Sequence, residues 1–207
     1  MRKTVYTILL VVLLLPMQAQ TDSLSNCRFM APVTGTTLLA TGSAFTFVPA
    51  MKDVAVGMRE RVQADGHEKM LFDNYLQYLP AVTTPVLKLC GFKSKHDFKK
   101  LALLEGGSYL FGALVLNGAK YGFGVQRPDV AVYNSFPSGH TFTAFTGAEV
   151  LRREYGEDYP WLAVAGYTVA TLVGVMRVYN DRHWLGDVLA GAGLGILSVS
   201  FTYWLFD

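Results

Sequence analysis

The sequence predicts an all-α fold: an antiparallel helical bundle that crosses a membrane five or six times. Hydrophobic residues make up 51% of the 207 residues and charged residues only 16%, below the roughly 25% of a typical soluble domain. Long apolar runs recur along the chain without the alternation that is typical of strands. The last run, 188–206, carries no charge and is long enough as a helix to cross about 30 Å of hydrocarbon.

The N-terminus has the pattern of a secretory signal. Arg2 and Lys3 precede an apolar run over 5–15, and Ala19 supplies a small residue for cleavage. We expect 1–19 to be a signal peptide. The alternative is a short anchor that stays attached, although a full span needs about 20 residues. Either form directs the chain to a membrane.

Residues 20–70 form the next expected unit, an apolar segment followed by a polar amphipathic one. The apolar part, 29–51, has no charged residue, and Pro32 and Pro49 should limit its helix. Residues 52–70 mix both charges, as an exposed helix or loop does. The chain has two cysteines, Cys27 and Cys90, too few to define a disulfide framework, and their pairing stays open.

Residues 71–207 are expected to form the main helical bundle. Small residues in its last run should let neighbouring helices approach closely. These residues are Gly191, Ala192, Gly193 and Gly195. The apolar runs in this unit are 71–89, 101–119, 141–151, 161–176 and 188–206.

Basic residues between the runs predict the orientation. Four lysines at 93, 95, 99 and 100 should lie at the same end of the bundle as Arg152 and Arg153. Positive residues mark the cytoplasmic side of a membrane. We expect Glu149 to pair with these two arginines and Glu105 to sit near the lysines, neither being catalytic. His67 and His96 are expected to be ordinary surface histidines.

Three polar clusters interrupt the apolar runs at the opposite end. The first contains Lys120 and Arg127, with glycines between them. Taken alone, two basic residues beside a membrane helix are most simply interfacial. Glycines in the same stretch allow the backbone to bend or to approach a ligand closely.

The second cluster places Ser138, Gly139 and His140 at the start of a helical run. Ser138 suits the N-cap, so an ordinary helix start is the simplest interpretation. However, a helix N-terminus with free amides also binds anions such as phosphate. Gly139 would let an oxyanion approach those amides, with His140 beside it.

The third cluster contains Arg177, His183 and Asp187. His183 and Asp187 are four residues apart, and we expect them on one face of a helix. A carboxylate in that position fixes the tautomer of the imidazole and leaves the other ring nitrogen free. The alternative is a structural pair.

Together the three clusters predict a phosphate site. In an antiparallel bundle they fall at one end, so three cations, a helix N-terminus and two histidines converge. Cations stabilise the charge of a phosphoryl transition state, while one histidine attacks phosphorus and the other protonates the leaving oxygen. A zinc site built from the histidines with Asp181 and Asp187 is the rival, but the nearby cations would oppose a divalent metal. We therefore expect no metal and no cofactor.

The spacing of these residues resembles the tripartite signature of the type 2 phosphatidic acid phosphatase superfamily. The signature reads Lys, six residues, Arg-Pro; then Pro-Ser-Gly-His; then Arg, five residues, His, three residues, Asp. It extends from Lys120 to Asp187. The sequence departs from the family pattern at Met176, where the family usually has serine before the arginine.

The resemblance implies a metal-independent phosphatase built on a helical bundle. By analogy, His183 is the nucleophile that forms a phosphohistidine, Asp187 orients it, and His140 is the general acid and later the base. The remaining positions bind the phosphoryl oxygens: Lys120, Arg127, Arg177, Ser138 and Gly139. The family also includes vanadium haloperoxidases and soluble acid phosphatases, so the resemblance does not define the substrate.

The leading hypothesis is a lipid phosphatase in the bacterial inner membrane, with its active site facing the periplasm. Its substrate would be a polyprenyl pyrophosphate, phosphatidylglycerol phosphate, phosphatidic acid or a lipid A phosphate. Two alternatives are a soluble or peripheral periplasmic acid phosphatase and, ranked lower, a non-enzymatic membrane scaffold. A net charge of +2 without a basic stripe does not favour nucleic acid as a partner.

Overall fold

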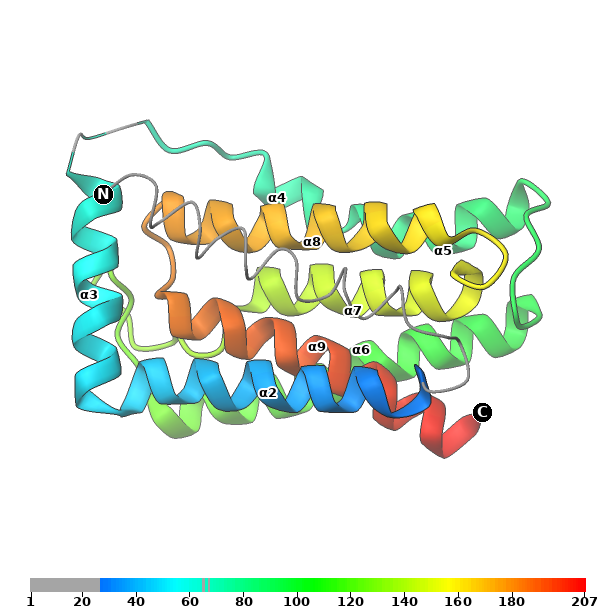
Figure 1. Ribbon diagram of the computed structural model, residues 1–207, viewed down its shortest axis with the longest axis horizontal. Helices are drawn as coiled ribbons and strands as arrows, with labels where there is room; N and C mark the ends of the chain where they lie inside the picture. The colour runs from blue at the N-terminus through cyan, green and yellow to red at the C-terminus, as the bar shows by residue number, and fades with distance from the viewer. Residues whose placement is uncertain (1–26, 65, 67) are drawn as a thin grey trace.

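The described residues of the computed structural model form an all-α bundle, as the sequence predicts (Figure 1). The structure describes residues 27–207 except 65 and 67, so the predicted signal segment 1–19 and His67 lie outside the described residues. The helices are α2 (Cys27–Phe47), α3 (Pro49–Gln63), α4 (Asp73–Leu76), α5 (Leu79–Leu89), α6 (Phe98–Phe123), α7 (Gly139–Tyr155), α8 (Pro160–Tyr179) and α9 (Leu185–Phe206).

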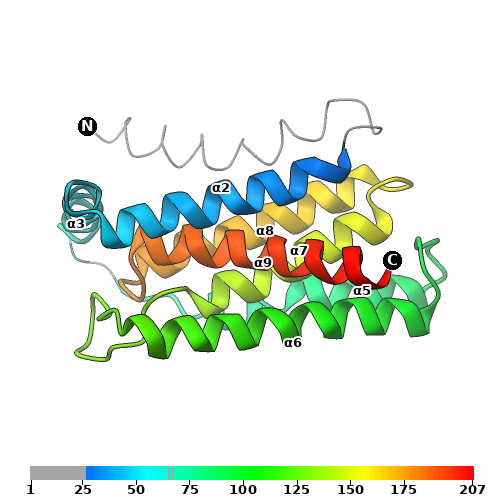
Figure 2. The same ribbon diagram turned by 90° about the horizontal axis from the view of Figure 1, so that it is seen from below.

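Helix α7 occupies the middle of the bundle and packs against α5, α6, α8 and α9. Most of its residues are buried, and Phe145 packs against Tyr167 of α8 with ring centroids 5.9 Å apart. One core cluster joins α2, α7, α8 and α9 around Ala144, Val173 and Ile196. The long helices therefore share one interior, with the polar connections left at the two ends (Figure 2).

Glycines allow α2 and α9 to lie against each other along their length. A Cβ atom on Gly193 would stand 2.5 Å from both the Gly35 carbonyl oxygen and the Leu39 nitrogen. A Cβ on Gly195 would stand 2.9 Å from the Phe142 carbonyl oxygen of α7. The prediction that small residues in 188–206 permit close helix packing is confirmed. The division of the chain at residue 70 stays a prediction, although α2 packs within the same bundle.

One sequence expectation about the first half is wrong, and one of its apolar runs forms two helices. Pro32 does not limit the first helix, because α2 begins at Cys27 and contains Pro32 in its second turn, where one backbone bond is lost without ending the helix. The run 71–89 is not one helix. It divides into the four residues of α4 and the eleven of α5, separated by Gln77 and Tyr78.

Three described helices, α6, α8 and α9, are long and apolar enough to cross a membrane. The chain is therefore a membrane protein, whereas the predicted total of five or six spans stays a prediction. Asp97 caps the start of α6, where its side chain accepts a hydrogen bond from the Lys100 nitrogen at 2.8 Å, and the helix ends before Gly124, which has a φ of 55°. Much of α6 is exposed and apolar, including Leu103, Leu110 and Leu114. Such a face suits contact with lipid.

The end that holds the loop between α5 and α6 gathers the basic residues that were expected together. Glu149 is fully buried and forms ion pairs with Arg152 and Arg153, both at 2.7 Å, as predicted. His96 is not a surface histidine, since its side chain is only 13% exposed. Its Nδ1 lies 2.8 Å from Glu154 and its Nε2 lies 2.7 Å from Asp207.

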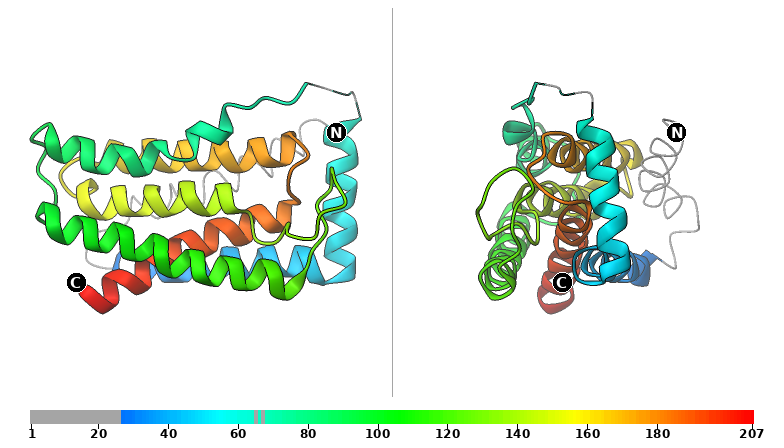
Figure 3. Two further views of the ribbon diagram at one scale, coloured as in Figure 1. Left: turned by 180° about the vertical axis from the view of Figure 1, so that it is seen from behind. Right: turned by 90° about the vertical axis from the view of Figure 1, so that its left-hand side faces the viewer.

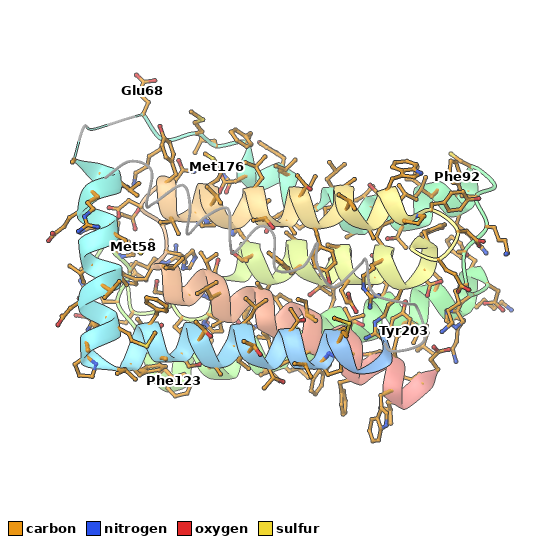
Figure 4. The ribbon with its side chains drawn as sticks, viewed as in Figure 1. Met58, Glu68, Phe92, Phe123, Met176 and Tyr203 are labelled. Carbon is orange, nitrogen blue, oxygen red and sulfur yellow. The ribbon has the colours of Figure 1, made fainter. Side chains whose placement is uncertain are left out.

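Figure 4 marks the two ends of the bundle. Phe92 and Tyr203 lie at the basic end, and Phe123 and Met176 lie toward the other end. Helix α3 crosses that other end almost perpendicular to the long helices (Figure 3). The connections 124–138 and 180–184 also lie there, so the three signature clusters are at one end of the molecule.

Candidate active site

Backbone bonds fasten the connections that carry the three clusters. The Ser138 nitrogen donates to the Asp187 carbonyl oxygen at 2.9 Å, which joins the start of α7 to the first turn of α9. Within the loop after α6, the Ser135 nitrogen donates to the Val125 carbonyl oxygen at 2.8 Å. The loop therefore folds back so that its last residues reach the turn between α8 and α9.

His183 is buried beside Asp187, and a serine lies between them. The His183 Nδ1 is 3.3 Å from the Ser135 hydroxyl and 3.4 Å from Asp187 Oδ2. The Ser135 hydroxyl donates to that same carboxylate oxygen, which also accepts from the Trp184 nitrogen at 3.0 Å. Because Nδ1 is engaged on this side, Nε2 is the ring nitrogen available to a substrate.

His183 and Asp187 do not share a helix face, contrary to the sequence prediction. Helix α8 ends at Tyr179, and Asp181 adopts a left-handed backbone conformation with a φ of 58°. His183 consequently lies in the turn before α9, while Asp187 is in the first turn of that helix. The two side chains are nevertheless close, because the turn between α8 and α9 places the His183 ring beside the first turn of α9.

Burial is the main influence on the acid–base behaviour of His183, which lies outside the candidate spans. Removal from water lowers the pKa of His183 to about 4, and the charges of Arg177 and Lys120 act in the same direction. The hydrogen bond to Asp187 opposes this shift without cancelling it. The ring is therefore neutral near pH 7, as a nucleophile must be.

Asn134 joins the two cations of the first cluster. The Lys120 ammonium donates to the Asn134 carbonyl oxygen at 2.6 Å, and Arg127 Nε donates to its side-chain oxygen at 2.8 Å. Asn134 directly precedes Ser135, so one short segment positions both cations and supports His183. The first and third clusters are thus linked through two neighbouring residues.

Arg177 reaches the site from the last turn of α8 and is paired with Asp73 of α4. Its Nη1 donates to Asp73 Oδ2 at 2.8 Å, and both side chains are nearly inaccessible to solvent. The second Asp73 oxygen accepts from Asn180 Nδ2 at 3.3 Å. The Arg177 Nε is buried without a hydrogen-bond partner among the described residues. A buried donor of this kind suits an anionic ligand.

The second cluster begins α7, as predicted. Ser138 occupies the N-cap, but its side chain does not cap the helix and instead accepts a hydrogen bond from the Thr141 hydroxyl at 3.0 Å. A Cβ on Gly139 would meet nothing within 4 Å, so this position borders open space. The half-buried His140 has its Nε2 2.9 Å from the Asn74 side-chain oxygen.

The structure thus brings together all eight residues proposed from the sequence, and the cluster suits a phosphoryl group. Three cations and helix amides can bind its oxygens, and two imidazoles can exchange protons or attack phosphorus. The sequence interpretation missed four supporting residues: Asp73, Asn74, Asn134 and Ser135. Adjacency to the second cluster could have identified the last two, whereas no spacing pointed to the first two.

Fold and site together define a class of helical membrane proteins in which cations and histidines gather at one end of the bundle. A sequence profile described as the PAP2 superfamily, the type 2 phosphatidic acid phosphatases, matches residues 101–207. The chain belongs to this superfamily. The resemblance inferred from the signature is confirmed, and the match includes all eight of the proposed site residues.

Curated relatives include two bacterial phosphatases. The chain is 45% identical over 137 residues to a lipid A 1-phosphatase of Porphyromonas gingivalis, covering 65% of this chain and 31% of that protein. It is 38% identical over 84 residues to phosphatidylglycerophosphatase B of Bacillus subtilis, covering 34% of this chain and 41% of that protein. The chain therefore spans less than half the length of either relative.

Two solved structures share the fold. The structure of Aquifex aeolicus LpxE matches with a TM-score of 0.56 and 24% identity, over 72% of this chain and 93% of that chain. A transmembrane PAP2-type phosphatidylglycerolphosphate phosphatase from Bacillus subtilis matches with a TM-score of 0.59 and 21% identity, over 84% of this chain and 94% of that chain. The predicted all-α PAP2-like bundle is confirmed.

Proposed function

We propose that the chain is a metal-independent lipid phosphate phosphatase. The observation that carries this proposal is the buried His183–Ser135–Asp187 group. Arg177 and Lys120 act on this histidine, and Asn134, next to Ser135, holds the third cation, Arg127. A neutral imidazole with one free nitrogen, in a cationic pocket, suits attack on a phosphate ester. Family membership and the names of the relatives support the same reaction class.

The reaction has two steps, each with its own proton transfer. His183 Nε2 attacks phosphorus, the bond to the lipid oxygen breaks, and protonated His140 gives its proton to that oxygen. The phosphohistidine is then attacked by water, from which His140 takes a proton, and inorganic phosphate leaves. Asp187 balances the positive charge on His183 during the first step.

The cations and the α7 N-terminus would bind the non-bridging oxygens. Arg177 has a buried Nε without a partner among the described residues, and a Cβ on Gly139 would meet nothing within 4 Å, which leaves room for a phosphoryl oxygen beside the start of α7. Charge that develops on those oxygens is stabilised by donors already in position. Lys120 and Arg127, both held by hydrogen bonds to Asn134, would supply further positive charge for these oxygens.

We further propose that the substrate carries a lipid tail and that the site faces the periplasm from the bacterial inner membrane. Three candidate spans and the exposed apolar face of α6 favour a lipid substrate over a soluble one. The basic end, with Lys93, Lys95, Lys99 and Lys100, would be cytoplasmic. These features weigh against the soluble acid phosphatase and the non-enzymatic scaffold.

A panel of purified lipid phosphates in detergent micelles tests this function. The panel holds a lipid A 1-phosphate, phosphatidylglycerol phosphate, phosphatidic acid and a polyprenyl pyrophosphate, with release of inorganic phosphate as the readout. We expect release from at least one member, unchanged by EDTA and lost in His183→Ala. Acid-quenched protein should carry phosphate on histidine. No release from any member by folded protein, or release that persists in His183→Ala, would overturn the proposal.

A further inference from the structure

The short helix α4 contacts two of the three signature clusters through adjacent side chains. Asp73 accepts a hydrogen bond from Arg177 at 2.8 Å, and Asn74 places its side-chain oxygen 2.9 Å from His140 Nε2. Both residues precede residue 101, where the match to the PAP2 profile begins. The part of the chain outside the recognised family region therefore contributes to the site.

The segment that leads into α4 is also fixed to Asn180, which lies within the third cluster. The Met70 nitrogen donates to the Asn180 side-chain oxygen at 2.9 Å, and Asn180 Nδ2 donates back to the Met70 carbonyl oxygen at 2.6 Å. Asp73 is 1% exposed and is paired with a nearly buried Arg177. Asn74 consequently rests on a rigid support, which is what positioning a neighbour requires.

We propose that Asn74 is a positioning residue that fixes the ring orientation and the tautomer of His140. The proposal rests on the phosphatase function proposed above, in which His140 exchanges the proton of the leaving group. An amide oxygen only accepts, so its contact with Nε2 keeps a proton on that nitrogen in the neutral ring. Nδ1 is then the nitrogen that gains and loses the catalytic proton.

A neutral partner is suited to a residue that must act first as acid and then as base. A carboxylate at this position would stabilise the imidazolium and make His140 a weaker acid. Asparagine orients the ring without adding charge. Burial is the largest influence on His140 and lowers its pKa to about 4, so the negative charge of a bound phosphate group must favour the protonated ring before it can act as the acid. Arg177 from α8, His183 from the turn before α9 and Arg127 from the loop before α7 also lower this pKa, whereas Asp73 from α4 raises it.

Two substitutions separate positioning from mere structural support. Asn74→Asp keeps the size of the side chain and adds a carboxylate beside Nε2. It should raise the pKa of His140 and move the alkaline limb of the kcat profile upward by about 1 pH unit. Asn74→Ala removes the acceptor without adding charge. It should lower kcat about 10-fold or more while KM changes little, since phosphate binding by the cations is retained.

The leaving group gives a readout that a folding defect would not produce. The p-nitrophenolate of p-nitrophenyl phosphate is a stable anion and leaves without a proton. The alkoxide of an alkyl phosphate is a poor leaving group and needs protonation by the general acid. Asn74→Ala should therefore lose at least 10-fold more activity on the alkyl ester of a micellar lipid phosphate than on p-nitrophenyl phosphate. Equal losses on the two esters would overturn the proposal.

Gln126→Glu is the matched control for the added charge. Gln126 is exposed in the loop at the same end of the bundle, and its backbone oxygen accepts a hydrogen bond from the Trp184 indole nitrogen at 2.9 Å. This variant should leave the pH profile unchanged. An equal pH shift in Gln126→Glu and Asn74→Asp, or no shift in Asn74→Asp, would overturn the role of Asn74. Inactive wild-type protein would instead overturn the phosphatase function itself.

Discussion

At the scale of single residues, the support for His183 depends on one hydroxyl. Ser135 is fully buried and lies between the imidazole Nδ1 and the Asp187 carboxylate, accepting from one and donating to the other. The direct His183–Asp187 distance, 3.4 Å, is too long for a strong bond. Ser135 therefore supplies most of the hydrogen bonding that orients His183, the proposed nucleophile.

Replacing this hydroxyl should slow the reaction. We expect Ser135→Ala to lower kcat about 10- to 100-fold, the effect of losing a hydrogen bond to a charged group, with little change in KM. Steady-state release of inorganic phosphate measures both constants. Ser198→Ala is the control, since Ser198 is equally buried but its hydroxyl donates to the Gly195 carbonyl oxygen within α9. Comparable losses of kcat in the two variants would contradict the role of Ser135.

The protonation state of His183 gives a pH prediction. Its pKa of about 4 lies below the ordinary value of 6.5, so the unfolded state binds the proton more tightly than the folded state. Stability should accordingly fall as the pH drops from about 6.5 through 4. The acid limb of kcat/KM, which reports the free enzyme, should lie near pH 4. A limb centred near 6.5 would mean that the nucleophile is not desolvated as described.

The sequence was sufficient to find the charged residues of the site but not their supports. Lys120, Arg127, Arg177 and the two histidines carry chemistry that stands out against apolar runs. Asp73 and Asn74 do not, because they lie in a polar stretch far from the signature. Their role arises only when α4 folds against the end of α8, a tertiary contact without a local pattern.

At the scale of helices, glycines decide how closely α9 approaches its neighbours. Gly193→Ala should lower the free energy of unfolding by about 1–3 kcal/mol, because the new Cβ would overlap the backbone of α2 at 2.5 Å. Gly118→Ala on α6 should be neutral or stabilising by up to about 1 kcal/mol, since nothing lies within 4 Å. Thermal unfolding in detergent micelles compares the two. Equal destabilisation would show that α2 does not pack here.

Helix α3 is fastened across the catalytic end by Arg59. This side chain forms a two-point ion pair with Asp181 at 2.7 and 2.8 Å, donates to the Pro128 carbonyl oxygen at 3.1 Å, and lies 5.5 Å from the centre of the Trp184 ring. One residue thus joins the loops that carry the first and third clusters. The polar character of 52–70 predicted an exposed segment, but not that it would cross the site.

We expect Arg59→Ala to lower kcat/KM about 10-fold or more, because the two loops lose a shared anchor made of charge-assisted bonds. Arg59→Lys should recover only part of the activity, since an ammonium cannot form the two-point contact. Arg61→Ala is the matched control on the same helix, where the side chain is exposed. Phosphate release from a micellar lipid phosphate measures all three. Equal effects at residues 59 and 61 would exclude an anchoring role.

At the scale of the whole molecule, the two ends of the bundle carry different groups of polar residues. One end holds the signature clusters under α3, and the other holds Lys93, Lys95 and the buried Glu149 network. The sequence could predict that these two groups lie at opposite ends, because short connections between antiparallel helices place successive loops at alternate ends of the bundle. The number of crossings could not be predicted as well, since α5 and α7 are shorter or more polar than a free-standing span and depend on burial by their neighbours.

Cys90 offers a direct test of orientation, because it is exposed and free and directly follows α5, in the loop at the basic end of the bundle. In a Cys27→Ser chain, where Cys90 is the remaining thiol, an impermeant maleimide should leave Cys90 unlabelled in intact spheroplasts and label it after lysis. A second chain carries Cys27→Ser, Cys90→Ser and Gln126→Cys, so that its one thiol is at position 126. This thiol reports on the other end of the bundle, where the signature clusters lie. That thiol should react in intact spheroplasts, since a substrate-binding end in the periplasm is open to the reagent. Labelling of Cys90 but not of position 126 before lysis would place the catalytic end in the cytoplasm and reverse the orientation proposed from the lysines.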